Sequence, residues 1–156
     1  MENWAIQGAV SRLRGLAEVF NGTVCSPATE NEIHQARWMS RHIFGCDLPQ
    51  EYMDFARYAN GLEVDGLTIF STRNSDLLES DDIISANQRL RFGEDISHIF
   101  IGQLDDRRLI GFSLINYRWE FVERGSRVYL SGSYDFNEFL GRLVDAVVNE
   151  DPASYC

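Results

Sequence analysis

The first stretch of the chain carries apolar residues at helical spacing. Five of them follow one another in steps of four and three, at Ile6, Val10, Leu13, Ala17 and Phe20. This spacing places them on one face of a helix. Two heptads are too few for a coiled coil. The pattern therefore predicts a packed N-terminal helix over residues 4–20, ended by the turn residues Asn21 and Gly22.

A second helix is predicted over residues 28–44. Thr29 suits its N-cap, and acids in the first turn suit the helix dipole. Gly45 is a natural end. The inner positions of this helix are Ile33, Ala36, Met39 or Ser40, and Ile43. Trp38 and Arg37 lie off this stripe, so they are either an exposed anchor for a partner or part of a core face assigned differently.

A third helix begins at Pro49, a residue suited to the first helical position, and ends at Asn60-Gly61. Its inward residues are Tyr52, Phe55, Ala56 and Ala59. A short strand follows over residues 67–70, and a short helix over residues 81–91. These assignments place four helices before the main run of strands.

The pattern then changes to aromatic and β-branched residues with turn residues between them. Strands are predicted over 98–102, 109–114, 119–122 and 127–130. Residues 135–149 return to helical spacing, and 150–156 form a frayed tail. Helices and strands that are segregated along the chain predict an α+β fold: a single domain, 1–156, with a mostly antiparallel central sheet flanked by helices.

Composition adds a strong acidic balance. The chain has 156 residues, with 24 acidic and 14 basic ones and a formal net charge of −10. Every basic residue is arginine, which excludes lysine nucleophiles and phosphate-loop lysines. A nucleic-acid binder normally shows the opposite charge. An acidic surface favours basic partners, mainly through faster encounter.

Candidate catalytic chemistry is sparse. No dinucleotide, phosphate-loop, zinc-protease or nucleophile-elbow motif occurs. His34 and His42 are two helical turns apart, too far for one metal ion, and His98 opens a predicted strand. Asp47 next to Cys46 raises the pKa expected for that thiol. The sequence predicts no enzyme, no cofactor and no metal site.

The sequence says less about the cell compartment and the oligomeric state than about the fold. Three cysteines without a CxxC spacing favour a reducing compartment over a disulfide scaffold. The first residues lack the pattern of a secretory signal, and no apolar run is long enough to cross a bilayer. We expect a cytoplasmic protein with no membrane contact. The oligomeric state stays open, with a monomer favoured.

Eight acids against two arginines lie between Asp76 and Asp106, which concentrates charge of −6 in this segment. Composition alone leaves two interpretations open: a surface that confers solubility, or a docking surface for a basic protein. Paired carboxylates of a small hydrolase are a further alternative. The candidate partner-binding residues are Glu63, Asp65, Glu79, Asp81, Asp82, Glu94, Asp95, Asp105 and Asp106.

Five stretches together resemble the SUKH superfamily of Smi/Knr-like domains, and its YrhA-like group in particular. They are LPQEYMDF at 48–55, NGLEVDGLTIFS at 60–71, DIISAN at 82–87, FGEDIS at 92–97 and FNEFL at 136–140. Each is a turn with aromatic residues, and their order and spacing carry the resemblance. It covers about residues 30–147, so the helix within residues 1–22 is an addition to it.

The resemblance implies a central sheet with flanking helices and no enzymatic activity. In bacteria such domains are mostly immunity proteins, which bind and neutralise a polymorphic toxin, often a nuclease or a nucleic-acid deaminase. The expected partner is one basic toxin domain in a one-to-one complex. The family carries over no defined set of binding residues. Eukaryotic relatives act in signalling, so a regulatory scaffold with several weak partners is the alternative.

Overall fold

A computed structural model describes residues 3–91 and 97–149 of the chain. Its elements in chain order are α1 (Trp4–Phe20), β1 (Thr23–Val24), α2 (Glu30–Phe44), α3 (Gln50–Ala56), β2 (Leu62–Val64), β3 (Leu67–Ile69), α4 (Ile83–Leu90), β4 (His98–Leu104), β5 (Arg108–Ser113), β6 (Trp119–Glu123), β7 (Tyr129–Ser133) and α5 (Phe136–Asn149). The strands form one seven-stranded sheet in the order β1 to β7, and each is antiparallel to the next. The predicted α+β single domain with an antiparallel sheet is confirmed.

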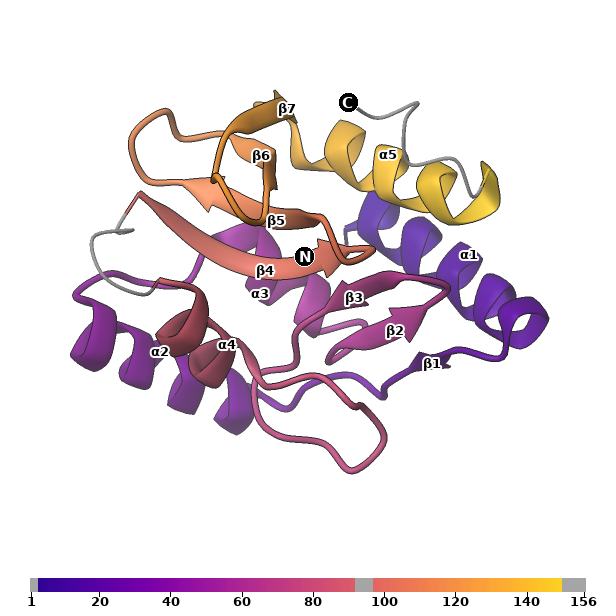
Figure 1. Ribbon diagram of the computed structural model, residues 1–156. Helices are drawn as coiled ribbons and strands as arrows, with labels where there is room; N and C mark the ends of the chain where they lie inside the picture. Colours follow the sequence, from indigo (N-terminus) through magenta and orange to yellow (C-terminus); the bar gives the residue numbers. More distant parts are fainter. Residues whose placement is uncertain (1–2, 92–96, 150–156) are drawn as a thin grey trace.

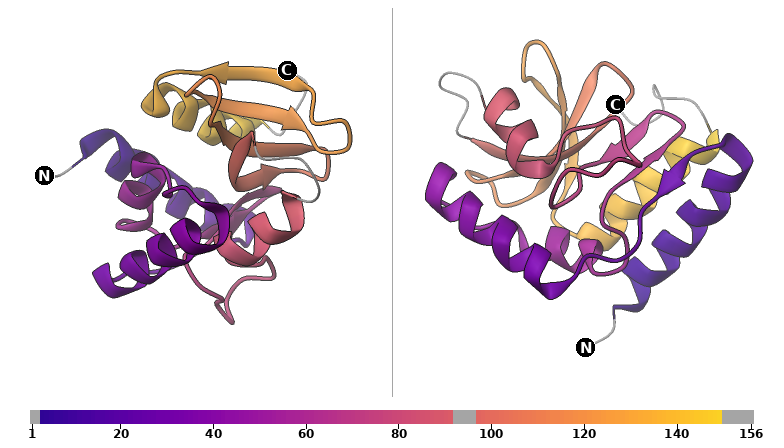
Figure 2. Two further views of the ribbon diagram at one scale, coloured as in Figure 1. Left: turned by 90° about the vertical axis from the view of Figure 1, so that its left-hand side faces the viewer. Right: turned by 90° about the horizontal axis from the view of Figure 1, so that it is seen from below.

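Helices pack on the sheet in two groups (Figures 1 and 2). α1 and α5 lie side by side, and α2 lies against α4, which itself packs on β4. Aromatic rings join α5 to the sheet: the Trp119 ring lies 4.7 Å from the Phe136 ring, and the Phe121 ring lies 4.7 Å from the Phe139 ring, between centroids. The main core therefore lies between the sheet and the α1–α5 layer.

The first two helices follow from their caps and apolar spacing. α1 has the predicted bounds, and the Asn3 side chain caps it by accepting the Ile6 N–H. In α2, Thr29 and Glu32 form a reciprocal capping box. One predicted core position in α2 is wrong, because Ile43 is 41% exposed. Of the two alternatives at the position before it, Met39 and Ser40, Ser40 is the buried one. Its hydroxyl donates to the Cys46 carbonyl at 2.8 Å, so the buried polar atom has a hydrogen-bond partner.

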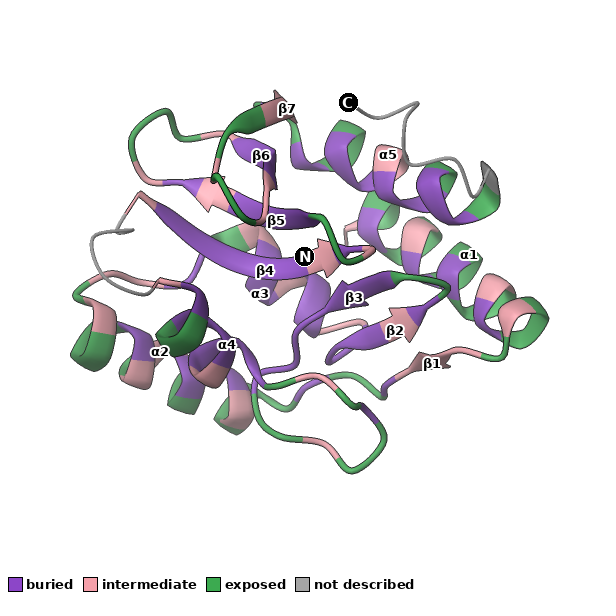
Figure 3. Ribbon diagram, in the orientation of Figure 1, coloured by how far each residue is buried: buried purple, intermediate pink, exposed green. Residues whose placement is uncertain are grey.

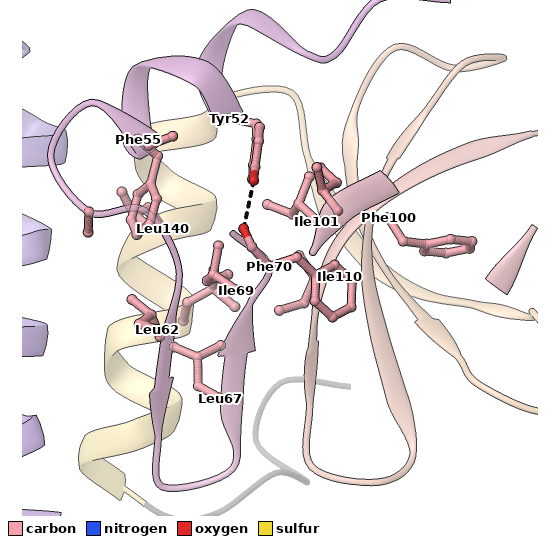
Figure 4. Packing of buried hydrophobic residues seen from close by; sticks show 14 of the residues in the cluster. Tyr52, Phe55, Leu62, Leu67, Ile69, Phe70, Phe100, Ile101, Ile110 and Leu140 are labelled. Carbon is pink, nitrogen blue, oxygen red and sulfur yellow. Dashed lines mark hydrogen bonds between the residues drawn. The ribbon is translucent and has the colours of Figure 1, made fainter. Parts of the chain in front are cut away.

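Residues 48–71, which carry much of the resemblance to the SUKH superfamily, pack against one another and against the sheet in the core (Figure 4). Pro49 precedes α3, which ends at Ala56, before the predicted end at Asn60-Gly61. The buried Tyr52 hydroxyl donates to the Phe70 carbonyl at 2.6 Å, and burial raises the pKa of Tyr52. Tyr52 thereby ties α3 to the residue that follows β3, which is a structural role.

The hairpin β2–β3 contains a strand that the apolar pattern did not predict. Asp65 and Gly66 join the strands with positive φ angles of 46° and 88°, which is the backbone of a type I′ turn. Asp-Gly is the preferred sequence for that turn, so a signal for Leu62–Val64 was present. β1 was also missed, because two residues are too few to show a period. β7 begins two residues and ends three residues later than predicted, and Arg127, with φ 63°, belongs to the preceding turn.

Candidate binding surface

Two turns of the sheet place three acids beside one another. Asp65 lies in the β2–β3 turn, and Asp105 and Asp106 lie between β4 and β5. The Asp105 N–H donates to the Gly66 carbonyl at 2.8 Å, so the two turns are in contact. Residues forty positions apart in the chain are therefore neighbours at one end of the sheet, on the right in Figure 1.

Two further acids lie at this end: Glu63 of β2, and Glu79 of the loop between β3 and α4. The Glu63 carboxylate accepts the N–H groups of Glu79 at 3.0 Å and Ser80 at 2.8 Å. Glu63, Asp65 and Glu79 line an open cleft of about 390 Å³. We name the acidic end as the set Glu63, Asp65, Glu79, Asp105 and Asp106.

The acids of the acidic end differ in how far the fold already uses them. Glu63 is half-buried and holds the loop. Asp105 is half-buried, accepts the Arg107 N–H at 2.7 Å and forms an ion pair with Arg108 at 3.2 Å. Asp65, Glu79 and Asp106 are exposed, and no ion-pair partner for them occurs within residues 3–91 and 97–149. These three carboxylates are the charges that an approaching cation would meet.

Two of the acids predicted from sequence, Asp81 and Asp82, lie elsewhere in the fold. Asp82 is 9% exposed, and its carboxylate caps α4 by accepting the Ser85 N–H at 2.8 Å. Asp81 is exposed and pairs with Arg89 at 3.3 Å. Glu94 and Asp95 lie outside the described residues. Asp82 therefore caps a helix. From the sequence, Asp82 was predicted only to lie at the start of a short helix.

A buried polar network, which the sequence analysis missed, lies on β4 and β6. The His98 ring lies between two partners, with the Ser97 hydroxyl 2.9 Å from Nδ1 and the Glu120 carboxylate 2.7 Å from Nε2. Glu120 is 2% exposed, and the Arg118 guanidinium holds its other oxygen. That carboxylate also raises the pKa of Arg118 through their hydrogen bond. Residues 22 apart in sequence meet here only through the sheet register, which no local pattern encodes.

The order hydroxyl, imidazole, carboxylate also occurs in hydrolases. In this chain the Glu120 carboxylate is shared between His98 and a cation, Arg118. A buried carboxylate needs such donors to offset its desolvation. The arrangement is that of a structural ion network within the sheet.

The cysteines and histidines supply little further chemistry. Burial raises the pKa of the Cys25 and Cys46 thiols, which disfavours the reactive thiolate. Across the described ranges, no three side chains of His, Cys, Asp or Glu are grouped so as to hold a metal ion. Among the same residues, each helix is too short or too polar to cross a bilayer.

Trp38 is an exposed aromatic residue on α2. The residue is 64% exposed, and its ring stacks on the His42 ring, with centroids 4.9 Å apart and planes within 7°. Arg37 pairs with Asp47 at 2.9 Å. The sequence left open whether Trp38 is a core residue, and the structure places it on the surface.

Comparison with models of known protein families found no match, and comparison with curated proteins found none either.

Proposed function

We propose that this chain is a bacterial immunity protein of the SUKH superfamily, in its YrhA-like group, which binds and neutralises a polymorphic toxin domain in the cytoplasm. The observation that carries the proposal is the acidic end. Three exposed carboxylates without an ion-pair partner among the described residues lie at this end, two of them, Asp65 and Glu79, on one cleft, on a chain of net charge −10. The order of the motif residues between 48 and 140 supports the family.

Electrostatic attraction gives the mechanism. A toxin that acts on nucleic acid carries a basic groove for the phosphate backbone. Asp65, Glu79 and Asp106 would face that groove as a substitute for the phosphates, and so exclude the substrate. Charge complementarity of this kind raises association rates by about 10- to 1000-fold at low salt. The protein acts by binding and is not an enzyme.

The cleft beside these acids offers a site that a side chain of the partner could enter. Thr68 and Gln103 line it together with Glu63. The Gln103 oxygen already accepts from Arg124 at 3.2 Å, and the Glu63 oxygens accept backbone N–H groups. A cationic side chain that enters the cleft therefore meets chiefly the exposed carboxylates of Asp65 and Glu79. Arginine is the residue that uses such a site best, because its planar head donates several hydrogen bonds.

Affinity capture from the native host tests the proposal. The tagged protein is the bait, bound proteins are identified by mass spectrometry, and elution is followed against salt. We expect one basic toxin domain, retained in a one-to-one ratio and released as salt rises. Several weakly held partners would instead support the regulatory scaffold.

A second arm covers a toxin that the host does not express. The neighbouring open reading frame is expressed in a test strain with and without this protein. We expect growth only when both are present. Growth arrest that this protein fails to relieve, together with no captured toxin, would contradict the proposal.

A further inference from the structure

Two arginines lie across from each other next to the acidic end. Arg107 belongs to the turn that joins β4 to β5, and Arg124 belongs to the turn that joins β6 to β7. The Arg124 N–H donates to the Arg107 carbonyl at 2.6 Å, so the two residues are neighbours on adjacent strand ends. Figure 3 shows exposed residues in both turns. Like charges that lie opposite one another in an antiparallel pair repel, so this arrangement does not favour folding.

The register of the sheet puts both side chains on the face that carries Gln103. Gln103 pairs with Leu109, and Leu109 pairs with Val122. Because side chains alternate between the two faces of a strand, the residues two positions from Leu109 and Val122 share their face. These residues are Arg107 and Arg124. The Arg124 guanidinium accordingly reaches across β5 and donates to Gln103 Oε1 at 3.2 Å.

Neither guanidinium has a carboxylate partner within residues 3–91 and 97–149. Arg107 is exposed, and its side chain makes no hydrogen bond, ion pair or ring contact in these ranges. Arg124 is half-buried and uses one of its N–H donors on Gln103. The neighbouring Arg108, by contrast, is 4% exposed and pairs with Asp105 at 3.2 Å. The arginine pair, Arg107 and Arg124, therefore has donors left for an anion that another molecule supplies.

We propose that the arginine pair binds a carboxylate of the toxin, so that the binding surface is bipolar. The inference rests on the proposed function and adds a second half to the contact. Gln103, which accepts from Arg124, also lines the cleft of Asp65 and Glu79. The arginine pair thus borders on the acidic end. A partner that docks here must present a basic side chain to the cleft and an acidic side chain to the arginine pair, which fixes its orientation.

Enzymes that act on nucleic acid carry this combination of charges. A basic groove holds the phosphate backbone, and carboxylates in the groove bind catalytic metal ions or move protons. A guanidinium fits a carboxylate well, because its planar head donates two parallel hydrogen bonds. A catalytic carboxylate of the toxin is therefore the group that the arginine pair would cover. A free nucleic acid is a poorer occupant, because the acidic end repels its phosphates.

Kinetics of the complex with the captured toxin domain test the inference. Arg107→Gln makes the chain more acidic by one charge, so general electrostatics alone would leave association with a basic partner unchanged or faster. We expect the complex of this variant to dissociate at least about tenfold faster, because a carboxylate of the toxin loses its partner. Arg124→Gln should act in the same direction. The matched control is Arg12→Gln, which removes the same charge from an exposed position on α1 and should leave dissociation unchanged.

Urea denaturation shows whether the loss belongs to binding rather than to folding. Arg107→Gln should unfold at the same urea concentration as the parent protein or at a higher one, since it removes a repulsion. A lower midpoint would make the arginine pair structural and contradict the inference.

The kinetic outcomes separate this inference from the proposed function. Dissociation that is equal in Arg107→Gln and Arg12→Gln, while Asp65→Asn with Asp106→Asn slows association, would overturn the inference and leave the proposed function standing. Unchanged association in that acid variant would count against the proposed function instead. The absence of any toxin partner would remove both.

Discussion

Carboxylates serve two different purposes in two regions of this molecule. Inside the sheet, Glu120 is 2% exposed and is held by His98 and Arg118. At the acidic end, Asp65 and Asp106 are exposed and have no ion-pair partner within the described ranges. The first kind is needed for folding, because a buried charge must be matched. The charges of the second kind form no ion pair among the described residues that would stabilise the fold, and that difference is the reason we propose that they serve binding.

The largest expected effect on the free energy of unfolding comes from removing the buried carboxylate of Glu120. Glu120→Ala should lower the free energy of unfolding by about 3–5 kcal/mol, since it leaves His98 and the Arg118 charge without their partner. Glu120→Gln keeps the shape and some hydrogen bonds, so it should cost less. Urea denaturation measures both. Equal stability of Glu120→Ala and the parent protein would show that the network does not hold the sheet.

A smaller effect is expected at the start of α4. Asp82→Ala removes the N-cap and should cost about 1 kcal/mol of the free energy of unfolding. Glu79→Ala, three residues earlier, removes an exposed acid with the same charge and is expected to change stability by less than about 0.5 kcal/mol. Thermal unfolding of the two variants gives the comparison. A larger loss for Glu79→Ala would place it among the structural acids.

The third effect depends on pH and concerns Asp47, between α2 and α3. Hydrogen bonds from Arg37, and further ones from Arg41 and the Leu48 N–H, lower the pKa of Asp47 to about 2. Its contribution to stability is then complete above the unfolded pKa, about 3.9, and is lost as pH falls through about 2. The side chain is 34% exposed, so solvent screening keeps the contribution small.

The matching experiment compares Asp47→Asn with the parent protein between pH 2 and 7. The stability difference should be largest near neutral pH and should shrink below pH 4, as the parent carboxylate takes up its proton. A difference that stays constant over this range would mean that Asp47 contributes through packing alone.

Local patterns predicted most of the helices and much of the sheet. α1 and α2 follow from apolar spacing and caps, and those signals lie within a few residues of each other. Ile43 was misplaced because α2 ends beside a loop, where Ser40 hydrogen-bonds inward and the last turn faces solvent. β1 was missed because two residues show no period, and β2 was missed although the Asp-Gly turn that follows it was a signal for a hairpin.

Less of the candidate site than of the fold could be predicted from the sequence. An acid count between 76 and 106 did not separate Asp82, a helix cap, from Asp106, which is exposed and forms no ion pair among the described residues. The contact between the turns at Gly66 and Asp105 depends on the order of strands, which pairs residues far apart in the chain. The network of His98 and Glu120 depends on register in the same way.

The central claim concerns the acids that the fold leaves free, and one measurement tests it most directly. The rate of association with the captured toxin is followed by stopped flow against ionic strength, for the parent and for Asp65→Asn with Asp106→Asn. The control, Glu18→Gln with Asp145→Asn, removes the same charge from exposed positions on α1 and α5. We predict a rate at least tenfold lower at low salt and a weaker salt dependence for the first pair alone. Equal rates and equal salt dependence in both pairs would contradict the account.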